Sequence, residues 1–235
     1  AVGELDDALH EVADADAGQG RDHVSFGLDD KGDAAIIYGV VGTAYTLVDS
    51  VGFGAQADGT SEGRLPDGAA AVVPFPNSGT PGASNYRLLQ NLLVNEALAH
   101  TDPPLEDAVE LFNPTASPLN IGGWFLSNSK VDRRKYQIPA GTTIPANGFA
   151  VIYENQFNNG TSNAFTLNSA HGDQVWLSAA TAGVETGERV GAEFGASFNG
   201  VSFGQVLTSI GYDFAPLTHR TFGVDDPLSL ASFRT

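Results

Sequence analysis

Residues 108–127 read AVELFNPTASPLNIGGWFLS, and this stretch decides the fold class. Its two apolar runs, at 108–112 and 123–127, are short and rich in β-branched and aromatic residues, as strands are. Asn113-Pro114 and Ser117-Pro118 separate the runs and favour turns, because proline fixes its own backbone angle and cannot donate to a ladder of hydrogen bonds. The stretch therefore predicts two strands joined by a turn-rich connection.

Similar runs continue on both sides of this stretch. They lie at 92–98 (LLVNEAL), 148–153 (GFAVIY) and 174–177 (QVWL). Pro139-Ala-Gly141 and Pro145-Ala-Asn-Gly148 supply further turn signals, and no segment of 88–226 keeps the apolar period of a helix. Many short strands separated by turns predict an all-β fold, either a sandwich or a barrel.

The chain also repeats itself at long range. Residues 53–64 (FGAQADGTSEGR) align without a gap with residues 194–205 (FGASFNGVSFGQ), at an offset of 141 residues. Thr80-Pro-Gly82 aligns with Thr221-Phe-Gly223 at the same offset. A unit of about 140 residues is an ordinary domain size, so the sequence predicts a tandem arrangement.

The repeat predicts three segments. We expect residues 87–226 to form one complete unit. We expect residues 1–86 to be the C-terminal part of a preceding unit, with an acidic N-terminal segment and a linker, so that its opening half would lie before residue 1. Residues 227–235 would then be a connecting tail, and the chain would be part of a longer multidomain protein.

Short motifs follow one another in a fixed order through the predicted complete unit. They are Val94-Asn-Glu96, Val109-Glu-Leu-Phe-Asn-Pro114, Leu119-Asn-Ile-Gly-Gly-Trp-Phe-Leu126, Tyr136-Gln-Ile-Pro139, Gly141-Thr-Thr-Ile-Pro-Ala-Asn-Gly148 and Gly172-Asp-Gln-Val-Trp-Leu177. In this order they resemble the lamin tail domain family. The resemblance implies an immunoglobulin-like β-sandwich, and a non-catalytic part of a secreted or cell-surface bacterial protein.

The composition excludes several classes of partner and site. With 28 acidic and 11 basic residues the net charge is −17, which repels nucleic acid. No apolar run is long enough to span a membrane, and the lack of cysteine excludes disulfides, thiolate zinc sites and cysteine nucleophiles. A strongly acidic chain of this kind suits an extracellular or cell-surface location.

Two carboxylates and two indoles fall inside the predicted strands. Glu96 and Glu110 lie within apolar runs, and if they point inward they must accept hydrogen bonds, because a buried carboxylate without a partner is strongly destabilising. We therefore predict a structural role for both. Trp124 and Trp176 are predicted to anchor the core.

The motif Gly-x-Ser-x-Gly occurs twice, around Ser61 and around Ser202. Asp213 and His219 follow Ser202 in the chain order of an α/β-hydrolase triad. Such a triad needs its serine at a sharp turn between a strand and a helix, and the pattern offers no crossover helices. We therefore expect the motif to be a turn or bulge of the repeat, and the protein to be no enzyme.

The acidic segment at 1–33 contains Asp14, Asp16 and Asp22 around two glycines, and resembles a calcium loop. It does not meet the EF-hand pattern, since glycine stands at the fifth position and serine at the twelfth. The sequence favours a solvated acidic loop over a calcium site there, and predicts no other cofactor.

Lys130, Arg133, Arg134 and Lys135 form the one basic cluster of the sequence. One interpretation is a docking site for an acidic protein or an extracellular polymer. The other is a solvated hairpin loop, which is what a run of charges usually represents.

Two functions follow from these observations. The first is a non-catalytic structural or interaction module of a secreted or cell-surface bacterial protein, acting as a spacer or adhesion unit without nucleic acid or membrane insertion. The alternative is an accessory module that holds a ligand such as carbohydrate for a larger extracellular hydrolase. That alternative needs an exposed strip of aromatic side chains, for which the candidates are Tyr136, Tyr153, Phe157 and Phe198.

Overall fold

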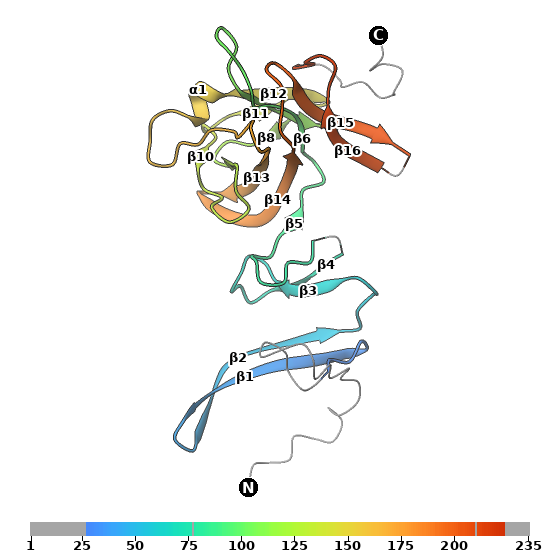
Figure 1. Cartoon of the computed structure of the whole chain (residues 1–235). Helices are drawn as coiled ribbons and strands as arrows, with labels where there is room; N and C mark the ends of the chain where they lie inside the picture. The colour runs from blue at the N-terminus through green and yellow to red at the C-terminus, as the bar shows by residue number, and fades with distance from the viewer. Residues whose placement is uncertain (1–26, 77, 210, 224–235) are drawn as a thin grey trace. The chain divides into compact units, whose positions relative to one another are not determined.

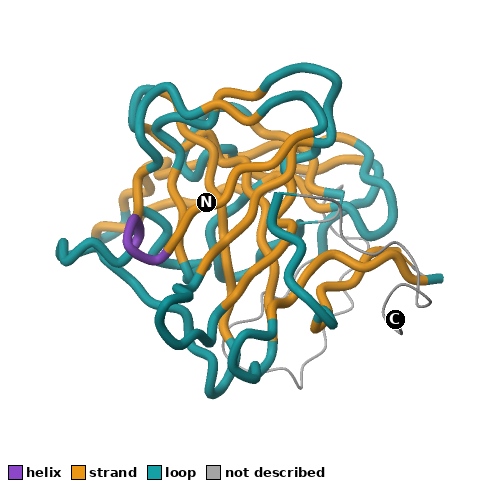
Figure 2. The backbone as a smooth tube through the Cα atoms, turned by 90° about the horizontal axis from the view of Figure 1, so that it is seen from above, coloured by secondary structure: helices purple, strands orange, loops and turns teal. Residues whose placement is uncertain are grey.

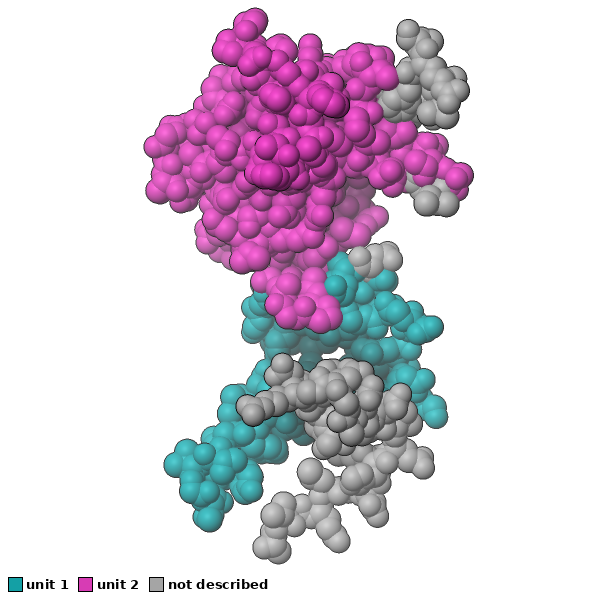
Figure 3. Space-filling model, viewed as in Figure 1, with its two compact units in different colours: residues 1–79 teal, residues 80–235 magenta. Residues whose placement is uncertain are grey.

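The chain divides into two compact units, residues 1–79 and 80–235 (Figure 3). The computed structural model describes residues 27–76, 78–209 and 211–223. The sequence placed the boundary at 86/87, whereas the structure groups Thr80–Tyr86 with the second unit. The backbone of this segment is hydrogen-bonded to unit 2, since the guanidinium of Arg189 donates to the carbonyl oxygen of Asn85 over 3.1 Å.

Unit 1 contains two antiparallel hairpins. The first pairs β1 (Gly32–Val41) with β2 (Ala44–Gly54), and the second pairs β3 (Ser61–Arg64) with β4 (Val72–Phe75) (Figure 1). Arg64 connects them, because its guanidinium donates to the carboxylate of Asp49 on β2 over 2.7 Å. The ion pair of Arg64 with Asp49 thus links the two hairpins of this unit.

Unit 2 is built from two five-stranded sheets. The first sheet has the order β10-β9-β13-β14-β5. Its strands are β5 (Arg87–Leu88), β9 (Phe125–Ser127), β10 (Tyr136–Gln137), β13 (Asp173–Thr181) and β14 (Val184–Phe194). All its pairings are antiparallel except that of β5 with β14, which is parallel.

The second sheet of unit 2 has the order β12-β7-β6-β15-β16 and is antiparallel throughout. Its strands are β6 (Leu93–Leu98), β7 (Ala108–Asn113), β12 (Gly148–Tyr153), β15 (Ser202–Thr208) and β16 (Gly211–Pro216). A short pair, β8 (Leu119–Asn120) with β11 (Thr143–Ile144), and one helical turn, α1 (Glu154–Phe157), complete the unit (Figure 2). No helix among the described residues is long and apolar enough to cross a membrane.

The core of unit 2 lies between the two sheets. Alternate residues of β13 (Val175, Leu177 and Ala179) face it, as the two-residue period of a strand requires. The facing sheet contributes Val94 and Leu111 to the same cluster. The all-β prediction is confirmed, and unit 2 is a β-sandwich.

The two tryptophans have different surroundings. Trp124 packs against the core cluster, as predicted. Trp176 is buried, but it stands between Val175 and Leu177 in β13 and is not part of the cluster between the sheets. Its ring is covered on the outer face of the first sheet instead, where the Tyr86 ring meets it edge-on at a centroid distance of 5.9 Å. Trp176 is therefore buried, as predicted, but it lies outside the cluster between the two sheets.

Candidate functional site

Two buried carboxylates lie side by side in the second sheet of unit 2. Glu96 on β6 and Glu110 on β7 are direct cross-strand partners, and each is 0% exposed. Two like charges in that position repel, and burial removes the water that would screen them. The pair is therefore destabilising unless hydrogen-bond donors reach both side chains.

Those donors come from the loop that closes the unit, Thr221–Gly223. The N–H of Thr221 donates to both carboxylate oxygens of Glu96, over 3.2 and 3.0 Å, and its hydroxyl donates to Oε2 over 2.8 Å. The N–H of Gly223 donates to Oε2 of Glu110. The predicted structural role of both glutamates is confirmed, and we call this arrangement the glutamate clasp.

A local irregularity supplies one further donor to the clasp. The register of β6 against β7 shifts between Val94 and Glu96, so Asn95 falls at a bulge. Its side-chain amide donates to Oε1 of Glu110 over 2.8 Å. Gly223 adopts a φ of +85°, a conformation that strains any residue with a β-carbon. Asn95 at the bulge and Gly223 thus donate to Glu110 from segments near the start and the end of unit 2.

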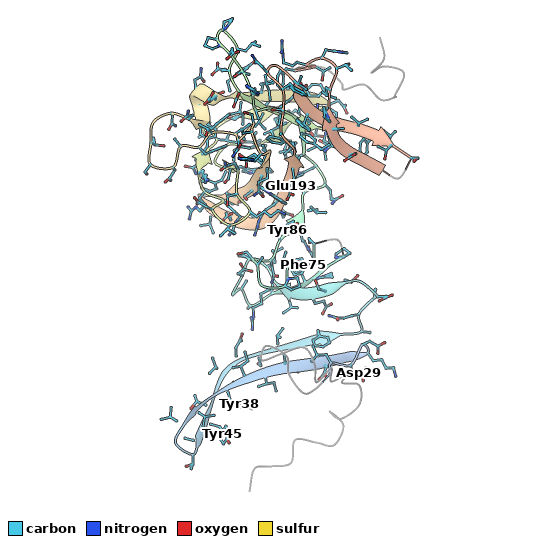
Figure 4. All side chains as sticks on the ribbon, in the orientation of Figure 1. Asp29, Tyr38, Tyr45, Phe75, Tyr86 and Glu193 are labelled. Atoms are coloured by element: carbon cyan, nitrogen blue, oxygen red, sulfur yellow. The ribbon has the colours of Figure 1, made fainter. Side chains whose placement is uncertain are left out.

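A second set of contacts fixes the leading segment of unit 2. Arg133 binds Glu185 through two hydrogen bonds of 2.8 and 3.2 Å and also donates to the Ser84 hydroxyl. Arg189 is buried and lies 4.9 Å from the ring centroid of Tyr86. Tyr86 is labelled in Figure 4. These contacts attach the segment 80–86 to the outer face of the first sheet.

The other three residues of the predicted basic cluster also have partners within unit 2. Lys130 pairs with Glu193 and lies 5.4 Å from the ring centroid of Trp176. Arg134 lies 4.9 Å from the Phe125 ring and donates to a backbone carbonyl over 2.9 Å. Lys135 donates to the side chain of Asn128 over 2.7 Å. The cluster holds the β9–β10 loop against its own sheet, and docking of an acidic partner stays a prediction.

Asp107, which sequence reasoning missed, is a buried carboxylate whose pKa is raised. Burial raises the pKa of Asp107 to about 6, and the neighbouring charge of Glu154 adds to this. The hydroxyl of Thr101, 2.9 Å away, and the charge of His100 lower the pKa but do not cancel the effect. A charged residue immediately before an apolar strand is the sequence signal that could have identified it.

The serine motifs do not form a nucleophile elbow. Ser202 begins β15, is buried, and lies opposite Leu98, with a strand and no helix after it. Asp213 lies on β16 and accepts the hydrogen bond of its neighbour Phe214, while the His219 ring contacts Thr218 over 3.0 Å. The described residues bring no base to Ser202.

Metal ligands do not gather in the described part of the chain, where no group of three or more His, Cys, Asp or Glu residues could hold an ion. The predicted calcium ligands Asp14, Asp16 and Asp22 lie outside the described residues.

Residues 89–193 match the Lamin Tail Domain family. That family is an immunoglobulin-like, non-enzymatic structural domain, and the sandwich of unit 2 agrees with it. The match includes both glutamates of the clasp but ends before the loop that supplies their donors. No match was found among curated proteins or among solved structures.

Proposed function

We propose that this chain is a non-catalytic spacer or adhesion module of a secreted or cell-surface bacterial protein, and that it carries tension between its neighbours. The observation that carries the proposal is the glutamate clasp, which ties the last described loop of unit 2 to the interior of its second sheet. A module that transmits force needs its final residues anchored in this way.

The leading end of the same unit is anchored in the other sheet. β5 pairs with β14 in parallel, and Arg133 and Arg189 hold the residues that precede it. Force on the two ends of unit 2 would therefore load both sheets. Release of the clasp would remove the donors of Thr221 and Gly223 from two buried carboxylates, which costs several kcal/mol and opposes peeling of the last loop.

The proposal of an extracellular location rests on the net charge of −17. Strong negative charge keeps a protein soluble and disfavours adhesion to nucleic acid. A tandem arrangement is supported by the repeat of 53–64 at 194–205.

The carbohydrate-holding alternative gains no support from the aromatic residues on which it depends. Tyr136 and Phe157 are buried, and burial raises the pKa of the Tyr136 hydroxyl. Tyr153 and Phe198 alone of the four are exposed. The four side chains therefore do not form one binding strip.

The proposal is tested by pulling single molecules of the chain from its two ends. We expect unit 2 to resist as one mechanical unit, and Glu96→Gln to lower its unfolding force, because forced unfolding reports the unfolding barrier. Glu188→Gln is the matched control, since Glu188 is exposed on β14. Equal unfolding forces for the original chain, Glu96→Gln and Glu188→Gln would contradict the proposal that the clasp resists force.

A further inference from the structure

Asparagine is followed by glycine three times in the sequence, at Asn147-Gly148, Asn159-Gly160 and Asn199-Gly200, and all three pairs lie in unit 2. Asparagine is one of the thermolabile residues, because its side-chain amide can react with the backbone nitrogen of the next residue. A glycine in that next position leaves the nitrogen unhindered, since it has no β-carbon. The sequence makes the three pairs alike, whereas their surroundings in the fold differ.

The reaction closes a five-membered ring within the chain. The backbone nitrogen of the glycine gives up its proton to a base and forms a bond to Cγ of the asparagine. The bond from Cγ to Nδ2 breaks, and Nδ2 leaves as ammonia with a proton from water. Water then opens the cyclic imide at either carbonyl, which gives aspartate or its isomer isoaspartate. A glycine N–H that is held in a hydrogen bond resists this reaction, because the nitrogen must lose its proton and turn toward Cγ.

The pair Asn199-Gly200 is held on both sides of the reacting bond. The N–H of Gly200 donates to the carbonyl oxygen of His100 over 2.7 Å. The side chain of Asn199 is fixed as well, since its Nδ2 donates to Oδ2 of Asp102. Ring closure at this pair would have to break both hydrogen bonds.

The pair Asn147-Gly148 is held by the start of β12. The N–H of Gly148 donates to the carbonyl oxygen of Pro145 over 3.1 Å, and that of Asn147 donates to Thr115 over 3.0 Å. Gly148 also pairs with Asn113 across β12 and β7. The backbone of this pair is therefore fixed by a turn on one side and a sheet on the other.

The pair Asn159-Gly160 lies in the loop that follows α1 (Figure 1). Asn159, Gly160 and Thr161 are all exposed. The N–H of Gly160 has no hydrogen bond to any of the residues that the structure describes. Gly160 has a φ of +77°, and a β-carbon built on it would meet no atom within 4 Å. The nitrogen of this glycine is thus free to react.

The same loop activates the carbonyl that the nitrogen attacks. The N–H of Thr161 donates to Oδ1 of Asn159 over 3.2 Å. Negative charge develops on Oδ1 when the nitrogen adds to Cγ, and a donor already directed at that oxygen stabilises it. The loop therefore combines a free nucleophile with a polarised electrophile, which neither of the other two pairs does.

We propose that Asn159 is a site of spontaneous deamidation, and that it reacts in the folded protein through a succinimide with Gly160 to give isoaspartate and aspartate. The products leave the sandwich folded, because the loop is closed at its base. The N–H of Phe165 donates to the carbonyl oxygen of Phe157 over 3.2 Å, and the two buried rings stack at a centroid distance of 4.8 Å. The new negative charge and the extra backbone carbon of isoaspartate stay at the exposed tip.

The test is incubation of the full chain in mildly alkaline buffer, followed by digestion and mass spectrometry of the three Asn-Gly peptides. We expect the Asn159 peptide to gain the mass difference between NH₂ and OH about tenfold faster than the other two, because breaking one hydrogen bond of ordinary strength slows a reaction by about that factor. Asn147 and Asn199 are controls within the same molecule. In denaturant the three rates should converge, since the bonds that protect these two residues are then lost.

Deamidation at Asn159 no faster than at Asn147 or Asn199 in the folded chain would overturn the inference. So would a ratio of rates that is the same in denaturant, since the local sequence and not the fold would then select the site. Asn159→Gln should lack the acidic product that anion exchange separates from the original chain. Asn159→Asp gives the standard for that product and should melt at the same temperature as the original chain; a lower melting temperature would contradict a folded product.

Discussion

Replacement of Glu96 by glutamine tests the glutamate clasp directly. The substitution keeps the shape of the side chain but removes its charge, and it replaces one acceptor oxygen by an NH₂ group that donates. Thr221 presents two donors to this carboxylate, its N–H and its hydroxyl. Both bonds end on Oε2, so an uncharged glutamine oxygen at that position still accepts them, while the NH₂ group replaces Oε1, the oxygen that accepts the N–H of Thr221 over 3.2 Å.

The expected loss follows from these contacts. A hydrogen bond to a charged group contributes about 1.5–3 kcal/mol, and loss of the bond to Oε1 with weakening of the two bonds to the now uncharged oxygen removes about 3 kcal/mol. Relief of the repulsion with Glu110 offsets part of this, so we expect a net destabilisation of about 2 kcal/mol. For a unit of this size that corresponds to a fall in Tm of roughly 4–8 °C.

Thermal unfolding followed by tryptophan fluorescence is the suitable assay, because both tryptophans of the chain, Trp124 and Trp176, lie in unit 2. Thr221→Val removes the hydroxyl alone and should cost about 1 kcal/mol, and the double variant should lose less than the sum of the two. Glu188→Gln should stay within about 0.5 kcal/mol of the original chain. A Tm for Glu96→Gln within about 1 °C of the control would refute the clasp.

Three further results are expected. Because the pKa of Asp107 is raised from 3.8 to about 6, the folded state binds the extra proton, and the contribution of this group to stability is lost as the pH rises from about 4 to about 6. Asp107→Asn should therefore stabilise the protein at pH 7.5 by at most about 3 kcal/mol and change little at pH 4, as denaturant titrations at the two pH values would show. Gly191→Ala should destabilise unit 2 by about 1–3 kcal/mol and shift its tryptophan emission, because the added β-carbon would lie 2.5 Å from the Trp176 ring; an unchanged spectrum would contradict this. Calorimetric titration of calcium should give no heat if the acidic segment is a solvated loop. A saturable exotherm that is lost when Asp14, Asp16 and Asp22 are replaced by asparagine would instead identify these residues as ligands.

The strands could be predicted from the sequence because their signals are local. The run GFAVIY at 148–153 coincides with β12. The run at 108–112 covers all of β7 except its last residue, Asn113. The need of Glu96 and Glu110 for donors also followed from the sequence, since it depends only on their apolar neighbours. Their donors did not, because Thr221 is 125 residues from Glu96 in the chain and only the assembled sandwich brings them together.

The position of Trp176 and the partners of the basic cluster were harder to predict from the sequence, because both depend on how the strands pack. The outward position of Trp176 follows from strand alternation once Val175 and Leu177 are assigned to the core. The partners of Lys130 and Arg133 lie on β14, more than fifty residues away, so a basic run gave no sign that its charges are used within the fold. Pairing of this kind is set by tertiary structure alone.

The clasp makes closure of the sandwich depend on both of its halves. β6 and β7 bring two carboxylates together in the opening half, where Asn95 supplies one donor, and the remaining donors that the clasp uses lie at the end of the closing half. Burial of the glutamates is therefore less favourable until Thr221 and Gly223 arrive, and the correct loop is selected because a wrong one would not supply these donors.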